Sequence, residues 1–155
     1  MSERRTLTLG NVCKIKYGKD HKKLNDGDIP VYGSGGIMRF VDTMIHDKKS
    51  VLIPRKGTLG NLFLANSPFW TVDTIFWTDV DNSLVETDFL YYMLQTKNLA
   101  GMNVGTAVPS LTTTVLNELE LSIPPIETQK QIAKILSSFD DKIELNNRIN
   151  DNLVA

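Results

Sequence analysis

The last part of the chain follows two consecutive prolines, Pro124 and Pro125, and contains neither glycine nor proline to its end. Proline cannot donate a backbone hydrogen bond, so the pair ends whatever element precedes it. Thr128 with Gln131 three residues later has the pattern of a capping box, which marks the start of a helix. The sequence therefore predicts one helix over residues 128–155, about 42 Å long at 1.5 Å per residue.

Apolar residues recur along this helix with the spacing of a coiled-coil seam, and the seam becomes mixed toward its end. The seam consists of Ile132, Leu136, Phe139, Ile143, Asn146 and Leu153. One interpretation is an amphipathic helix that lies flat on its own domain. The other, which we favour, is a projecting helix that seeks a partner helix, because a heptad seam needs a matching surface to bury against.

Length and composition indicate an ordinary soluble protein. The 155 residues suffice for one domain with a buried core, and 41% of them are hydrophobic and 23% charged. No apolar run is long enough to span a bilayer, and the N-terminus lacks a secretory signal. The single cysteine, Cys13, excludes an internal disulfide and a cysteine-based zinc site. We expect a cytoplasmic protein without a metal site.

The charge is distributed unevenly, although the net charge is only −1. Residues 1–60 carry twelve Lys and Arg against six Asp and Glu, whereas residues 61–155 carry five against twelve. This asymmetry allows a basic face for a polyanion on an otherwise acidic body.

The chain before the prolines is predicted to be rich in short strands. We expect strands over 12–16, 29–32, 37–41, 50–54, 62–65, 69–72, 74–78 and 119–123, and small helices over 89–95 and 113–117. Pro30 is expected to keep its strand at a sheet edge. The predicted class is α+β, with a compact β-rich domain over residues 1–123 and a helix over 124–155.

Two loops combine flexible backbone with hydrogen-bond donors. Residues 55–58 (RKGT) offer charged groups to phosphates or guanine edges, and Gly57 allows close approach of the backbone. The exposed loop over residues 17–28 adds three lysines. His21 and His46 have no partner at metal-ligand spacing and are expected to be solvated. No catalytic set can be singled out, which favours binding over catalysis.

Four motifs in register resemble one known family. They are residues 29–37 (IPVYGSGGI), 52–60 (LIPRKGTLG), 105–111 (GTAVPSL) and 124–133 (PPIETQKQIA). This series resembles a target recognition domain and the helix that follows it in the specificity subunit of Type I restriction-modification enzymes.

The resemblance implies a non-catalytic subunit that recognises a bipartite sequence in double-stranded DNA. Methyltransferase subunits and a restriction/translocase subunit would be its partners, and S-adenosylmethionine, Mg²⁺ and ATP would bind only to them. It also implies that the loops over 17–23, 32–36, 55–58 and 105–110 face DNA. The residues expected to bind DNA are Lys19, His21, Lys22, Lys23, Tyr32, Ser34, Gly35, Arg55, Lys56, Gly57, Thr58, Thr106 and Ser110.

The chain resembles half of such a subunit, with one recognition domain and one helix. The helix stops at Ala155 without a C-cap, so we expect the spacer helix to be incomplete, in a natural half-subunit or a truncated form. Pairing about a two-fold axis would make two such helices an antiparallel coiled coil and would require inverted-repeat half-sites. The alternative function is a protein-interaction adaptor that uses the aromatic-rich sheet and the helix; a hydrolase with an unrecognised site is least favoured.

Overall fold

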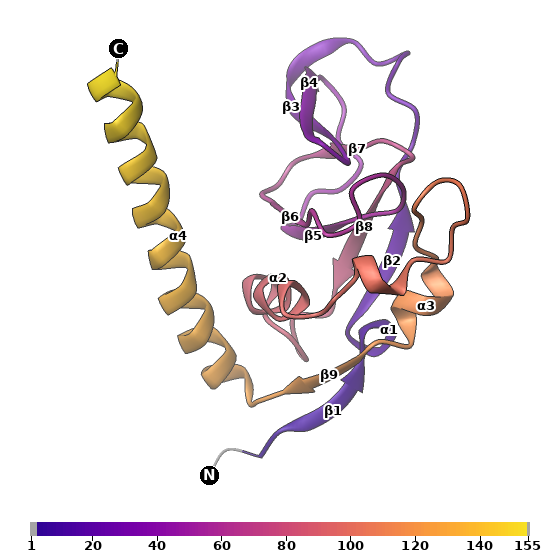
Figure 1. The fold of residues 1–155 in the computed structure, drawn as a ribbon, viewed down its shortest axis with the longest axis vertical. Coiled ribbons are helices and arrows are strands. Elements are labelled where there is room, and N and C mark those ends of the chain that lie inside the picture. Colours follow the sequence, from indigo (N-terminus) through magenta and orange to yellow (C-terminus); the bar gives the residue numbers. More distant parts are fainter. Residues whose placement is uncertain (1–2, 155) are drawn as a thin grey trace.

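Two small β-sheets and a strand pair form the body of the protein, and a long helix leaves it (Figure 1). The computed structural model describes residues 3–154. The strands are β1 (Arg5–Thr8), β2 (Cys13–Tyr17), β3 (Asp26–Gly33), β4 (Gly36–Val41), β5 (Ser50–Pro54), β6 (Phe63–Ala65), β7 (Trp70–Thr71), β8 (Ile75–Val80) and β9 (Glu120–Ile123). The helices are α1 (Leu9–Val12), α2 (Thr87–Gln95), the 3₁₀ helix η1 (Ala100–Met102), α3 (Thr113–Asn117) and α4 (Ile126–Val154). The predicted α+β class, a β-rich body with small helices and a long C-terminal helix, is confirmed.

The larger sheet has the strand order β2-β8-β5-β6, and β5 lies at the centre of the core. Every residue of β5 is buried. Val51 and Ile53 belong to the cluster formed with α1, α2, α3 and β9, whereas Leu52 packs with Phe69 and Ile75. Successive side chains of a strand point to opposite faces, so a strand covered on both faces needs an uninterrupted apolar run.

The smaller sheet has the order β4-β3-β7, which differs from the expectation for Pro30. We expected the proline to keep its strand at an edge, but β3 lies between two neighbours. Its pairing with β7 begins at Val31, so Pro30 lies outside that ladder and its missing N–H group costs no bond there. β3 also begins at Asp26, so the expected loop over 17–28 is shorter than predicted.

The long helix α4 begins two residues before the predicted start. The backbone N–H of Gln129 donates to Pro125 O at 3.1 Å, so Pro125 is the N-cap and Thr128 already lies inside the first turn. The expected capping box of Thr128 and Gln131 is therefore wrong. The pattern was misleading because the carbonyl that starts the helix belongs to the second proline. None of the helices in residues 3–154 has the length and apolarity that crossing a bilayer requires.

The apolar packing of α4 on the body is confined to its first turns, which lie against α2 (Figure 1). Gln129 and Ala133 are its buried residues, and Ile132 packs against the core from the edge. Beyond that point the seam is in water: Phe139 and Ile143 are 59% and 57% exposed. Leu136 and Leu153 are also exposed, as is Asn146. The helix therefore projects, and its apolar seam has no cover within residues 3–154.

A buried polar pair joins β5 to β8 where their backbone pairing ends. Thr78 Oγ1 donates to Val51 O at 2.9 Å and accepts from Val51 N at 3.0 Å. Ser50 Oγ donates to Thr78 O at 2.8 Å and accepts from Thr78 N at 2.9 Å. Both residues are completely buried. The two hydroxyl groups thus replace the backbone bonds that the sheet lacks at this point.

We expect Thr78→Val to lower the free energy of unfolding by about 1–3 kcal/mol, because it leaves the buried Val51 N–H without a partner. Urea denaturation followed by circular dichroism measures the change. The matched control is Thr114→Val on the exposed face of α3, which should stay within about 0.5 kcal/mol of wild type. Equal losses in the two variants would contradict this role of Thr78.

Candidate nucleic-acid interface

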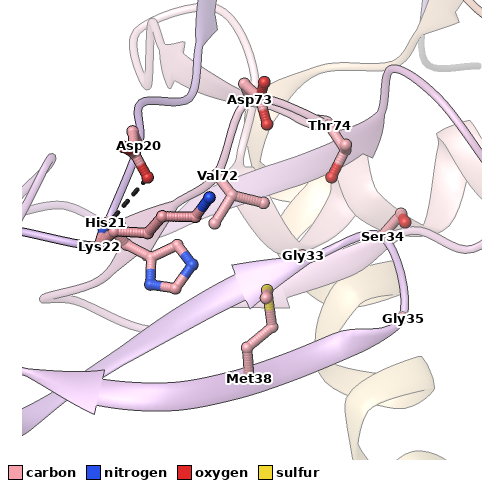
Figure 2. A pocket seen from close by; sticks show the side chains of 10 residues that line it. All are labelled: Asp20, His21, Lys22, Gly33, Ser34, Gly35, Met38, Val72, Asp73 and Thr74. Atoms are coloured by element: carbon pink, nitrogen blue, oxygen red, sulfur yellow. Dashed lines mark hydrogen bonds between the residues drawn. The ribbon is translucent and has the colours of Figure 1, made fainter.

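A pocket of about 670 Å³ lies where three loops of the body meet (Figure 2). The loop after β2 contributes residues 20–22, and the turn between β3 and β4 contributes residues 33–35. The turn between β7 and β8 contributes residues 72–74, and Met38 of β4 lies across from that turn. His21, Lys22, Ser34 and Gly35, all expected to bind DNA, are thus brought to one place.

The loop after β2 is attached to the β7 strand. Lys19 N donates to Thr71 O at 2.9 Å, and the indole N–H of Trp70 donates to Lys19 O at 3.0 Å. A Cβ at Gly18 would lie 1.9 Å from Val72 O, so only glycine allows this close approach. The side chains of Lys19, Lys22 and Lys23 remain exposed. Strand β7 therefore holds the loop, and the three lysine side chains are exposed to solvent.

The basic loop over residues 55–58 attaches to the same turn. Arg55 N and Lys56 N donate to Thr74 O at 2.8 and 3.2 Å, and an Arg55 guanidinium N–H donates to Asp73 O at 3.2 Å. The guanidinium carbon lies 5.2 Å from the centroid of the Tyr17 ring, a cation–π arrangement. These contacts hold Arg55 in one orientation, and its guanidinium keeps further N–H groups that can donate to a ligand.

Gly57 connects this loop to the turn between β3 and β4. Its φ of +93° lies in the left-handed region, and a Cβ there would come within 3.2 Å of Ser34 Oγ. Asn61 Nδ2 donates to Ser34 O at 3.2 Å and adds a second link. Thr58 is exposed at the outer side of the loop.

The loop over residues 105–110 completes the group. Lys56 and Ser110 form an isolated antiparallel β-bridge, and Gly57 N donates to Pro109 O at 3.3 Å. Asn103 Oδ1 accepts from Gly105 N at 2.8 Å and Ser110 N at 2.9 Å, which closes the loop. Thr106 is exposed within it.

Tyr32 lies apart from the other candidate residues. Its ring is half-buried, its centroid is 5.8 Å from that of Phe63, and burial raises its pKa. It lines a separate groove of about 550 Å³ between the body and α4, together with Tyr92 and Asp140. A contact between Tyr32 and DNA stays a prediction that this placement does not support.

The two histidines have different surroundings. His21 is half-buried beside the pocket. His46 was expected to be solvated, which is wrong: its ring lies 4.6 Å from Trp77 and 5.9 Å from Phe69, centroid to centroid. Burial lowers the pKa of His46, although Asp79 opposes the shift. No group of three potential metal ligands occurs within residues 3–154.

Sequence reasoning missed the residues between β7 and β8. Val72, Asp73 and Thr74 line the pocket, and the carbonyls of Asp73 and Thr74 accept hydrogen bonds from the basic loop. The available signal was the break at Asp73 between two predicted strands, which marks a turn but not its neighbours. Chemically, the surrounding lysines suit phosphates, whereas carboxylates such as Asp73 suit the exocyclic amino groups of bases.

Comparison with known proteins agrees with these features. The family model described as Type I restriction modification DNA specificity domain matches residues 1–155. The specificity subunit of the Type I restriction enzyme EcoprrI of Escherichia coli is 31% identical over 146 residues, which cover 89% of this chain and 36% of that protein.

Solved structures share the fold. A Type I restriction-modification S subunit from M. genitalium matches 92% of this chain and 40% of its own, with a TM-score of 0.79 and 21% identity. A chain from a structure that describes complex assembly and conformational transition of the type I R-M system matches 94% of this chain and 40% of its own length, with a TM-score of 0.70 and 18% identity. The chain thus spans less than half the length of these relatives. The family model matches the whole chain, and the fold is a β-rich body followed by a long helix. The chain therefore belongs to the family of Type I restriction-modification DNA specificity domains.

Proposed function

We propose that this chain reads one half of a bipartite sequence in double-stranded DNA as the specificity component of a Type I restriction-modification system. The observation that carries the proposal is that four loops lie beside one another within a specificity-domain fold. Residues 20–22 and 33–35 line one pocket with the turn between β7 and β8, the loop over 55–58 bonds to the same turn at Thr74 O, and the loop over 105–110 pairs with the loop over 55–58. Loops on a rigid sheet are a common way to hold recognition residues.

The contacts divide into two kinds. The exposed Lys19, Lys22, Lys23 and Lys56 would bind phosphates, which gives affinity without sequence information. Arg55, held by its bond to Asp73 O, would present its fork to a base edge, where a bidentate guanine contact is worth about 1–3 kcal/mol. The excess of positive charge in the first sixty residues supports this division.

We expect Lys56→Ala to weaken binding of every duplex about equally, and to lower the slope of log affinity against log salt by about one. Arg55→Ala should cost affinity mainly for the cognate duplex. Fluorescence anisotropy at several salt concentrations measures both effects.

The matched control is Lys134→Ala, which removes an exposed lysine from α4. It should bind like wild type at every salt concentration. Undiminished affinity of both Arg55→Ala and Lys56→Ala would remove the loop from the interface. Wild-type protein without salt-dependent affinity for duplex DNA would instead favour a protein-interaction adaptor.

Catalysis would reside on partner subunits. Methyltransferase subunits would bring S-adenosylmethionine, and a restriction/translocase subunit would bring ATP and Mg²⁺. The likeness to a chain from an assembled type I R-M system supports partners of this kind. We further propose that the chain itself is non-catalytic and works in the cytoplasm.

We also propose that α4 pairs with the same helix of a second copy or of another half-subunit. Support comes from the projecting helix, whose seam residues Phe139, Ile143 and Leu153 are more than half exposed. A two-fold axis across the seam makes the helices antiparallel and places one recognition body at each end. Asn146 within the seam would select the register at some cost in stability.

Leu136→Asp combined with Ile143→Asp should abolish self-association, because each pair of helices would bury four carboxylates. Sedimentation equilibrium measures the mass. The control adds the same charge to positions of α4 outside the seam through Ser138→Asp with Asn152→Asp, and should keep the wild-type mass. A wild-type protein that is monomeric at all concentrations would contradict pairing between identical copies.

A further inference from the structure

Gln129, near the start of α4, is completely buried although its side chain is polar. Its Oε1 accepts from Glu86 N at 2.8 Å, and its Nε2 donates to Pro124 O at 2.9 Å and Leu84 O at 3.2 Å. One amide thus joins three backbone groups from two separate segments, the approach to α2 and the proline pair. A buried amide with all of these partners satisfied has one orientation, since any rotation leaves backbone groups unpaired.

The second link between the helix and the body lies about three turns farther along. Tyr92 on α2 donates its hydroxyl hydrogen to Asp140 Oδ2 on α4 at 2.5 Å. Burial raises the pKa of the Tyr92 hydroxyl, and its bond to Asp140 adds to this shift. Beyond Asp140, every described residue of α4 is exposed. Two points therefore define the direction of the helix: Gln129 at its root and Asp140 near its middle.

We infer that Gln129, supported by the Tyr92–Asp140 bond, is a positioning residue that fixes the angle between α4 and the loop-bearing body. Through that angle it sets the spacing between the two DNA half-sites that a paired protein reads. The second statement rests on the proposed function, whereas the first concerns this chain alone.

The geometry makes the spacing sensitive to this angle. From Gln129 to Val154 the helix is about 38 Å long at 1.5 Å per residue. A rotation of about 10° at Gln129 would move the far end of the helix by about 7 Å, close to two base-pair steps of 3.4 Å. A small change of angle at the root would therefore shift one recognition body relative to the other by more than the length of one base-pair step.

The first test measures the angle without DNA. Spin labels on Lys16→Cys in β2 and Asn152→Cys in α4 report the distance between body and helix by double electron–electron resonance. The native Cys13 is buried, and burial raises the pKa of its thiol to about 12, so labelling is directed to the introduced cysteines. Dilution with an excess of unlabelled protein restricts the signal to pairs within one chain.

We expect a narrow distance distribution for the otherwise wild-type protein. Gln129→Met, which keeps the length of the side chain but removes its hydrogen bonds, should broaden or shift it. Gln131→Met is the matched control, because Gln131 is exposed and makes no side-chain hydrogen bond within residues 3–154; it should leave the distribution unchanged. A residue that only stabilises the fold would lower the melting temperature without changing the distribution. An unchanged distribution in Gln129→Met would overturn the inference.

If Gln129→Met does not fold, Tyr92→Phe tests the same inference. It removes one hydroxyl from a half-buried ring and should broaden the same distribution to a smaller extent. An unchanged distribution in Tyr92→Phe, with Gln129→Met unfolded, would also overturn the inference.

The second test uses duplexes that carry the inverted repeat selected from a random pool, with spacers that differ by one base pair. Wild type should bind one spacer at least tenfold more tightly than spacers two base pairs longer or shorter. Gln129→Met should reduce this preference to threefold or less. A broadened distance distribution with undiminished spacer preference would refute the link between angle and spacing. Failure of wild type to bind any duplex would refute the proposed function, while the spectroscopic result on Gln129 would stand.

Discussion

Backbone hydrogen bonds to the turn between β7 and β8 hold the recognition loops together. Thr71 O accepts from Lys19 N, Thr74 O accepts from both Arg55 N and Lys56 N, and Val72 N donates to Tyr32 O. Three segments far apart in the sequence thus depend on four consecutive residues. Since these bonds use main-chain atoms, side chains on the loops can vary without loss of the scaffold.

The long helix is attached in the opposite way, through few contacts that depend on particular side chains. The body buries a continuous core around β5, whereas α4 buries only Gln129 and Ala133. The side-chain hydrogen bonds that orient it come from one amide and one tyrosine hydroxyl, and its seam beyond Ile132 is exposed within residues 3–154. In the proposed function, recognition and spacing would therefore be carried by separate parts of the chain.

Much of the architecture could be predicted because its signals are local. Alternation of apolar residues in the strands and the absence of glycine from the helix can both be seen within short stretches of sequence. The basic loop at Arg55 can be recognised from its composition alone. The role of Gln129 could not be predicted, because Glu86 and Leu84 are more than forty positions away. The motif over residues 29–37 predicts that Tyr32 binds DNA, which stays a prediction; in the structure Tyr32 lines the groove beside α4, a placement that depends on contacts distant in sequence.

The central claim is that this chain directs modification to a defined DNA sequence. Methylation mapping of genomic DNA from cells that carry the complete system, with and without this chain, tests it most directly. The account predicts one bipartite motif of two half-sites with a fixed spacer, methylated only when the chain is present. A methylation pattern that is identical in the two strains would contradict it.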